Sequence, residues 1–347
     1  MRNATPTPIN LRPKRSVAAP NDLLAAMSRQ VVGQDGSLES IVPYVQMYQA
    51  GLAPEGRPVG VFLLLGPTGT GKTRTVEALA EAMHGSPKNL LRIDCGEFQM
   101  EHEVAKLIGA PPGYLGHRET TPLLTQQKLN AATSERSNLS IILFDEIEKA
   151  ALSLNRLLLG VLDKATLKLG DNTTVNFERS LIFLTSNLGA RGMSGELRPD
   201  FGFDALVQKP RRNLSRKLES IAMRAVKKRF SPEFVNRVDV ISTYLPLDNT
   251  ALNRILDLLL DDFRRLILHR LGQRAFAVEV SRGAREFLLK RGTSPEYGAR
   301  ELKRVVHRNL IQPIAAMVAQ GLVLPGAIVC AEGKASDEKL RIEAIPV

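Results

Sequence analysis

Eight residues near position 70 have the types and spacing of a phosphate-binding loop: Gly66, Pro67, Thr68, Gly69, Thr70, Gly71, Lys72 and Thr73. Small residues let backbone N–H groups surround phosphate oxygens, Lys72 can reach the β and γ phosphates, and the Thr73 hydroxyl can ligate Mg²⁺. A helix expected to begin there directs the positive end of its dipole at the same phosphates. The pattern predicts binding of a nucleoside triphosphate.

Two carboxylates follow another apolar run. Residues 141–144 are typical of a buried strand, and Asp145 and Glu146 come directly after them. The carboxyl ends of strands in an open α/β sheet form the crevice where ligands bind. Because phosphoryl transfer depends on positioning and charge neutralisation, we expect Asp145 to hold Mg²⁺ and Glu146 to polarise the attacking water. The alternative is that both residues only cap a helix over residues 147–162.

A polar residue follows a third apolar run. Residues 181–184 are followed by Thr185, Ser186 and Asn187. If this strand neighbours the previous one, Asn187 lies at the same rim as Asp145 and could orient water against the γ-phosphate. Residue type alone favours an ordinary turn, because Ser and Asn before Gly189 are common turn residues.

The elements that must position these residues follow from hydrophobic periodicity. Four apolar runs, expected to be strands, alternate with helical stretches: residues 59–65, 90–93, 141–144 and 181–184. This alternation predicts a doubly wound α/β core, with a parallel sheet flanked by helices on both faces. Residues 192–210 are rich in Gly, Pro and charge, so we expect a surface loop there, before a long basic helix over residues 213–230.

The pattern changes beyond residue 247. The elements expected there are a helix from Asp248 to about Leu271, a helical stretch over residues 300–320, and strands over residues 276–280, 327–331 and 340–345. We therefore expect three parts: a disordered basic arm (residues 1–20), a large nucleotide-binding domain (21–247) and a smaller mixed α/β domain (248–347).

Composition limits the function. The chain has 347 residues, 44% of them hydrophobic, which is enough for a substantial core. Its apolar runs are too short to span a bilayer and it opens with no signal-peptide pattern, so we expect a cytoplasmic protein without a membrane segment. Two distant cysteines predict neither a disulfide framework nor a structural zinc site. The net charge of +11 permits a nucleic-acid partner but does not require one.

Six segments, in this order, resemble the second ATPase module of the Clp-type heat-shock unfoldases and disaggregases, which belong to the AAA+ superfamily. They are residues 66–73 (GPTGTGKT), 107–116 (LIGAPPGYLG), 145–150 (DEIEKA), 185–189 (TSNLG), 230–237 (FSPEFVNR) and 297–300 (YGAR). The resemblance covers roughly residues 31–345. It implies an AAA+ P-loop NTPase fold, a C-terminal lid domain, and ATP with Mg²⁺ as cofactors.

The resemblance also implies roles for single residues. Asn187 resembles the first sensor, Arg300 the second sensor in the lid domain, and Arg237 the arginine finger that reaches the ATP of an adjacent subunit. Val32 is expected among the nucleotide-binding residues. Tyr114 and Leu115 match the loop that grips polypeptide in the central pore, whereas residues 168–176 correspond to a second, Gly-rich pore loop that is degraded here.

Together these features predict an ATP-hydrolysing protein-remodelling motor that assembles with copies of itself into a ring, expected to be a hexamer, and threads unfolded or misfolded polypeptide through its pore. Residues 201–203 lie where peptidase-associated relatives carry a docking tripeptide, which adds a peptidase or an adaptor to the partners to be considered. Two alternatives stay open. One is an AAA+ motor or loader acting on nucleic acid, and the other is an ATP-gated scaffold or adaptor in mixed rings.

Overall fold

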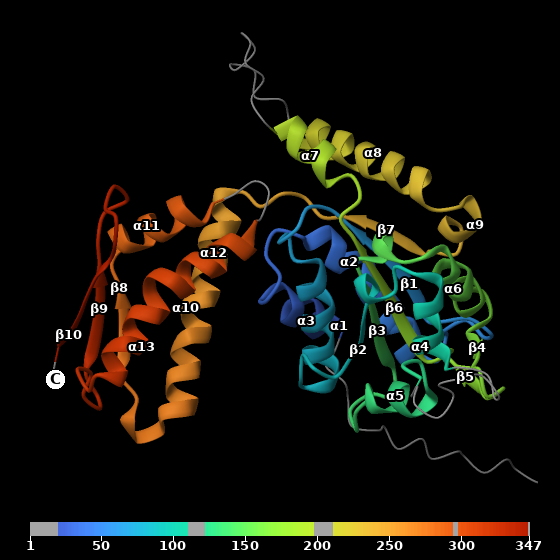
Figure 1. The fold of residues 1–347 in the computed structure, drawn as a ribbon, viewed down its shortest axis with the longest axis horizontal. Helices are drawn as coiled ribbons and strands as arrows, with labels where there is room; N and C mark the ends of the chain where they lie inside the picture. Colours follow the sequence, from blue (N-terminus) through green and yellow to red (C-terminus); the bar gives the residue numbers. More distant parts are fainter. Residues whose placement is uncertain (1–19, 110–121, 198–210, 294–297, 346–347) are drawn as a thin grey trace, which may run out of the picture.

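The computed structural model describes residues 20–109, 122–197, 211–293 and 298–345. These residues form two bodies, the larger one on the right of Figure 1 and the smaller one on the left. Each body has its own clusters of buried hydrophobic residues. The larger body has one cluster on each face of its sheet, and the smaller body has one cluster.

The larger body contains a parallel sheet of five strands. Its order is β2 (Leu91–Asp94), β3 (Ser140–Asp145), β6 (Ser180–Ser186), β1 (Gly60–Leu65) and β7 (Val240–Thr243). All four pairings are parallel. The three central strands β3, β6 and β1 are buried along their whole length, as expected for strands covered on both faces. The parallel α/β fold is therefore confirmed.

Alternate side chains of the strands enter two different cores. On one face, the side chains of Phe62 and Phe183 stack with ring centroids 4.8 Å apart and pack in one cluster with α1, α2 and α3. On the other face, Leu63 and Leu184 pack in a second cluster with α6 and α8. The helices of this body are α1 (Pro20–Ser28), α2 (Asp35–Gln49), α3 (Lys72–His84), α4 (Ala105–Ile108), α5 (Gln126–Ala131), α6 (Leu152–Lys164), α7 (Ala190–Leu197), α8 (Arg211–Arg229) and α9 (Pro232–Val235).

Several local predictions differ from the structure. The fifth strand, β7, was not predicted, because the strand is short and its residues are only half-buried at the sheet edge. The expected helix over residues 147–162 is interrupted: a 3₁₀ turn (Ile147–Lys149) precedes α6. The expected loop over residues 192–210 begins inside α7, and its remainder lies outside the described residues. Residues 168–176 belong to a hairpin of β4 (Thr166–Lys168) and β5 (Thr174–Asn176).

The smaller body packs helices against a three-stranded sheet of order β10–β9–β8. Asp248 caps its first helix by accepting the N–H of Ala251 at 2.8 Å, so the helix starts where the sequence predicted. The elements are α10 (Asn249–Leu271), β8 (Ala277–Val280), α11 (Arg282–Gly292), α12 (Ala299–Val306), a π-helical turn (His307–Ile311), α13 (Gln312–Ala319), β9 (Ile328–Glu332) and β10 (Arg341–Ile345). No helix among the described residues has the length and apolarity needed to cross a membrane.

Candidate active site

The phosphate-binding loop lies between β1 and α3, as the sequence predicted. Its backbone needs glycine, since Gly66, Gly69 and Gly71 have φ angles of 141°, 77° and 107°. At Gly66 a Cβ atom would lie 2.5 Å from the carbonyl oxygen of Tyr244, so β7 closes against the start of the loop. The loop leads directly into the N-terminus of α3, whose first two residues are Lys72 and Thr73.

Lys72 is buried and its ammonium group donates three hydrogen bonds. The acceptors are the carbonyl oxygens of Gly66 at 2.7 Å and Pro67 at 2.9 Å, and Oδ1 of Asn187 at 3.0 Å. Burial lowers the pKa of Lys72 to about 8, although the carboxylates of Glu148 and Asp145 oppose that shift. The lysine therefore remains a cation at neutral pH, at the end of the loop where phosphate oxygens would lie.

Asp145 and Glu146 lie at the carboxyl end of β3, beside the loop. The Asp145 carboxylate accepts a hydrogen bond from the Thr185 hydroxyl and is paired with the Arg92 guanidinium at 2.5 Å. Ala150 and Ala151 are extended, with ψ of 148° and 157°, which separates the 3₁₀ turn from α6. Glu146 itself is in the left-handed region, with φ 58° and ψ 48°. Strained backbone of this kind is concentrated at functional sites because surrounding contacts must hold it in place.

Asn187 connects the loop with the acidic pair. Its Oδ1 accepts from Lys72, and its Nδ2 donates to Oε1 of Glu146 at 3.1 Å. The Asn187 backbone N–H donates to Oε1 of Glu148 at 3.0 Å. The second carboxylate oxygen of Glu146 lies 2.5 Å from Nζ of Lys149. The adjacent parallel strands β1, β6 and β3 thus bring a cation, an amide and a carboxylate to one edge of the sheet.

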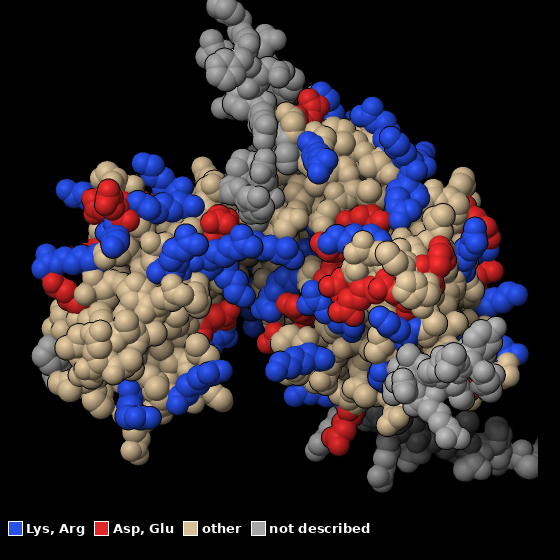
Figure 2. All heavy atoms as spheres, in the orientation of Figure 1, with Lys and Arg blue, Asp and Glu red and all other residues tan. Residues whose placement is uncertain are grey.

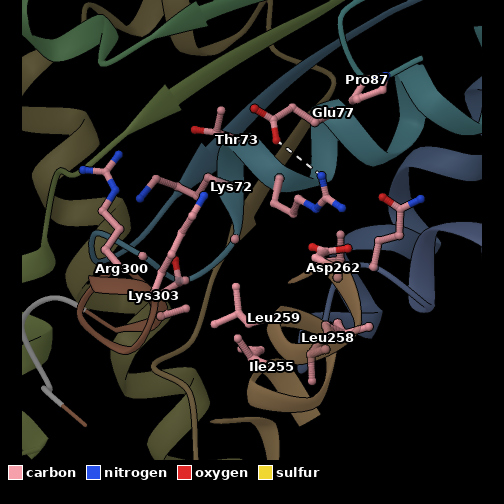
Figure 3. A pocket seen from close by; sticks show the side chains of 18 of the residues that line it. Lys72, Thr73, Glu77, Pro87, Ile255, Leu258, Leu259, Asp262, Arg300 and Lys303 are labelled. Atoms are coloured by element: carbon pink, nitrogen blue, oxygen red, sulfur yellow. Dashed lines mark ion pairs between the residues drawn. The ribbon is translucent and has the colours of Figure 1, made fainter. Parts of the chain in front are cut away.

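The smaller body completes the site. A cavity of about 1360 Å³ lies between the two bodies and is lined by residues of the loop, the acidic pair, Asn187 and Arg300. In Figure 3, Arg300 and Lys72 lie at the same end of this cavity, and Ile255 and Leu259 lie at another part of it. The N–H of Ala299 donates to the carbonyl oxygen of Gly69 at 3.1 Å, so α12 touches the phosphate-binding loop directly.

The cavity also has an apolar wall. Val32, buried like its neighbour Val31, lines it together with Leu247 and Ile255. A flat apolar base could lie against these side chains while the phosphates lie on the loop. The volume exceeds the roughly 300–1,000 Å³ of a typical small-ligand pocket, so the cavity is large enough for a nucleotide.

The donors for a magnesium ion are few. Thr73 and Asp145 line the same cavity, and both offer oxygen, which Mg²⁺ prefers. In the part of the chain that the structure describes, no cluster of three or more His, Cys, Asp or Glu side chains could hold a metal. Two protein oxygens suit Mg²⁺ bound mainly through phosphates and water, so the donor set fits the expected cofactor.

Other predicted residues lie elsewhere. Arg237 is not among the residues lining the cavity of its own chain; its guanidinium lies near Asp163 (3.4 Å) and Glu233 (3.2 Å). Tyr114 and Leu115 lie outside the described residues, as do residues 201–203.

Sequence reasoning missed two polar residues of the site. Gln34 is buried and donates to the carbonyl oxygens of Thr70 and Leu245, which ties the loop to the segment after β7. Arg92 pairs with Asp145 from the neighbouring strand β2. The available signal for Arg92 was a cation between two apolar residues, Leu91 and Ile93, in a strand that ends at the same edge as Asp145.

A phosphate-binding loop after one buried strand, an acidic pair at the end of another and an amide between them define a P-loop nucleoside triphosphatase. Comparison with known families agrees. A model described as "AAA domain (Cdc48 subfamily)" matches residues 57–241, and one described as "C-terminal, D2-small domain, of ClpB protein" matches residues 247–330. The first covers more than half of the chain, so the chain belongs to the AAA family of ATPases.

Individual relatives are similar over most of this chain. The chaperone protein ClpB of Meiothermus ruber is 36% identical over 301 residues, covering 87% of this chain and 33% of the relative. ClpB of Rhodopseudomonas palustris is 38% identical over 309 residues, covering 88% of this chain and 32% of the relative. The chain therefore spans about a third of the length of these relatives.

The fold is also similar to a solved structure. A closed-state cryo-electron-microscopy reconstruction of Hsp104 with ATPγS and FITC-casein matches with a TM-score of 0.76 and 26% sequence identity. The match covers 94% of this chain and 52% of that chain. This likeness extends over both bodies, and it agrees with the family assignment.

Proposed function

We propose that the chain binds ATP with Mg²⁺ in the cavity between its two bodies and hydrolyses it. In this proposal the loop residues from Gly66 to Thr73 and Val32 hold the nucleotide, and Thr73 and Asp145 hold the ion. Glu146 polarises the attacking water. The observation that carries the proposal is the bridge formed by Asn187 between Lys72 and Glu146, because it links the group that binds the γ-phosphate with the group that activates water.

We propose further that the site is completed by a second copy of the chain. Arg237 does not line the cavity of its own subunit, and in this proposal it exchanges its contacts with Asp163 and Glu233 for a neighbour's nucleotide. Arg300 supplies a cation from within the subunit. A finger that acts between subunits requires a closed ring, and we propose a hexamer. We also propose that residues 21–247 form the large domain and residues 248–347 the lid domain. The separate hydrophobic clusters of the two bodies support this division.

The work that hydrolysis drives is proposed to be the remodelling of polypeptide. Support comes from the similarity to ClpB chaperones and to Hsp104, whose reconstruction contains casein. We propose that Tyr114 and Leu115 grip unfolded or misfolded protein in the pore, that the protein acts in the cytoplasm, and that a peptidase or adaptor is a secondary partner. An aromatic side chain suits this task, because a flat apolar ring can contact any polypeptide.

The basic surface of α8 favours a second candidate, a motor that acts on nucleic acid. Figure 2 shows lysine and arginine side chains gathered along this helix. Arg216, Arg224, Lys227 and Lys228 are exposed, whereas Lys217 is paired with Glu196 at 2.6 Å. Such a stripe attracts phosphates without sequence preference, and its binding should weaken steeply with salt.

Steady-state ATP hydrolysis with and without a permanently unfolded protein such as casein separates these functions. We expect stimulation by the unfolded protein, loss of that stimulation in Tyr114→Ala, and unchanged ATP binding in the same variant. Stimulation by DNA but not by protein would reject polypeptide remodelling in favour of the nucleic-acid motor. Binding of ATP without turnover under either condition would favour the scaffold or adaptor.

A further inference from the structure

Arg229, the last residue of α8, lies between the nucleotide site and the segment that carries Arg237. Its guanidinium donates from Nε and Nη2 to the carbonyl oxygen of Glu148, at 3.1 and 2.9 Å, and from Nη2 to the carbonyl oxygen of Ala150 at 2.9 Å. The side chain is half-buried. One planar cation therefore holds the middle of the short turn that follows Glu146 and the residue directly after that turn.

That turn belongs to the nucleotide site. Glu148, whose carbonyl oxygen Arg229 holds, accepts the backbone N–H of Asn187 with its own carboxylate. Asn187 in turn contacts Lys72 and Glu146. A change in the contacts of Asn187 when a phosphate is bound or cleaved therefore acts on the turn that Arg229 holds.

On its other side Arg229 is joined to the finger segment. The next residue, Phe230, is buried, and its ring stacks on that of Phe234 in α9, with centroids 5.0 Å apart and planes 16° apart. Ser231 caps α9 through the N–H of Phe234, and the N–H of Arg237 donates to the carbonyl oxygen of Phe234 at 3.2 Å. Arg229 is thus connected to Arg237 through one helical turn and a stacked ring pair.

We propose that Arg229 is a positioning residue that couples the nucleotide site of one subunit to the arginine finger which that subunit presents to its neighbour. The inference rests on the proposed function, in which Arg237 acts between subunits. A planar guanidinium that donates to two carbonyl oxygens can keep both hydrogen bonds in few orientations. If the turn shifts, the Arg229 side chain therefore has to shift with it. The state of one site would in this way set the hydrolysis rate at the next.

Mixed rings can separate this coupling from a merely structural role. One subunit, the finger donor, carries Glu146→Gln, so it cannot hydrolyse ATP but presents an intact Arg237. The other, the site donor, carries Arg237→Ala and keeps an intact Glu146. Hydrolysis above the sum of the two separate preparations then arises where a finger donor faces a site donor. The test is to place Arg229→Lys in one subunit type at a time.

Lysine keeps the charge but cannot hold two carbonyl oxygens in one plane. We expect Arg229→Lys in the finger donor to lower the hydrolysis of mixed rings about tenfold, as expected for the loss of one hydrogen bond from a charged donor. In the site donor, whose finger is already absent, we expect less than about a twofold change, near the scatter between independent measurements of such couplings. Glu219→Gln, at an exposed position of the same helix, is the matched control and should change neither.

The outcomes are distinct. Equal losses in both subunit types, or a loss confined to the site donor, would show that Arg229 only shapes its own site and would overturn the coupling. Fluorescent-nucleotide binding by each Arg229→Lys subunit checks that the chain is folded, and we expect it to be unchanged. If the unmodified pair shows no rescue, the shared site of the proposed function is itself wrong.

Discussion

Gly298 tests the contact between the lid and the phosphate-binding loop. It has φ 49° and ψ −137°, a conformation that residues with a side chain rarely adopt. A Cβ atom there would lie 2.9 Å from the carbonyl oxygen of Gly69 and 3.1 Å from that of Thr68. Because both neighbours are backbone atoms, Gly298→Ala must push α12 away from the loop.

The size of the effect is set by two costs that exclude each other. Displacing α12 loses the hydrogen bond from Ala299 to Gly69, worth about 1 kcal/mol. If the lid stays docked, overlap with backbone atoms costs about 1 kcal/mol instead. In either case the docked arrangement that encloses ATP is disfavoured by about 1 kcal/mol, so ATP binding should be roughly fivefold weaker. The backbone strain at residue 298 lowers the free energy of unfolding instead, by about 1–3 kcal/mol.

Calorimetric titration with ATP, in the Glu146→Gln background to prevent turnover, measures this loss. Gly321→Ala is the matched control: Gly321 also has a positive φ, of 74°, but a Cβ atom there would have no neighbour within 4 Å. We expect Gly321→Ala to lower the free energy of unfolding and to leave ATP affinity unchanged. Wild-type affinity in Gly298→Ala, or equal losses in both variants, would refute a lid that contributes to nucleotide binding through this contact.

Three further predictions concern the site. Glu146→Gln should lower ATP hydrolysis at least about 100-fold and leave binding intact, since the amide keeps the shape but cannot accept a proton; unchanged turnover would exclude Glu146 as the base. Because the pKa of Lys72 is lowered to about 8, its ammonium loses the proton as pH rises through 8, so ATP affinity should fall up to tenfold per pH unit above that value. Lys72→Met should remove this dependence, and a slope that persists would assign it to another group. Arg237→Ala should lower hydrolysis about 10³-fold and inhibit wild-type neighbours in mixed rings, whereas strictly additive activity would count against a shared site.

The parts of the fold set by local pattern could be predicted. The buried strands ending at Leu65, Asp145 and Ser186 are continuous apolar runs, and each is followed by the polar residues that form the site. Because the carboxyl ends of parallel neighbours meet at one edge, Lys72 and Glu146 were expected at that edge, whereas Asn187 was expected there only if its strand neighboured that of Glu146. The start of α10 at Asp248 followed from its capping side chain.

The parts that depend on tertiary contacts could not be predicted. β7 is short and half-buried, so it has little hydrophobic pattern of its own and forms because β1 offers an unpaired edge. The interruption before α6 lies at Ala150 and Ala151, whose extended backbone makes tertiary hydrogen bonds to Arg229 and to the carbonyl oxygen of Phe98. The bonds of Arg229 span about 80 positions of sequence, and a helix C-terminus rich in basic residues gives no sign of which one is half-buried.

A nucleotide site completed by a neighbouring copy is tested most directly by measuring particle mass and ATP turnover together over a range of protein concentrations. With ATP, the mass should reach about six times the 38.1 kDa of one chain, and turnover per chain should rise with the fraction assembled. A chain that stays monomeric with bound ATP and turns it over at a rate independent of concentration would contradict the shared site.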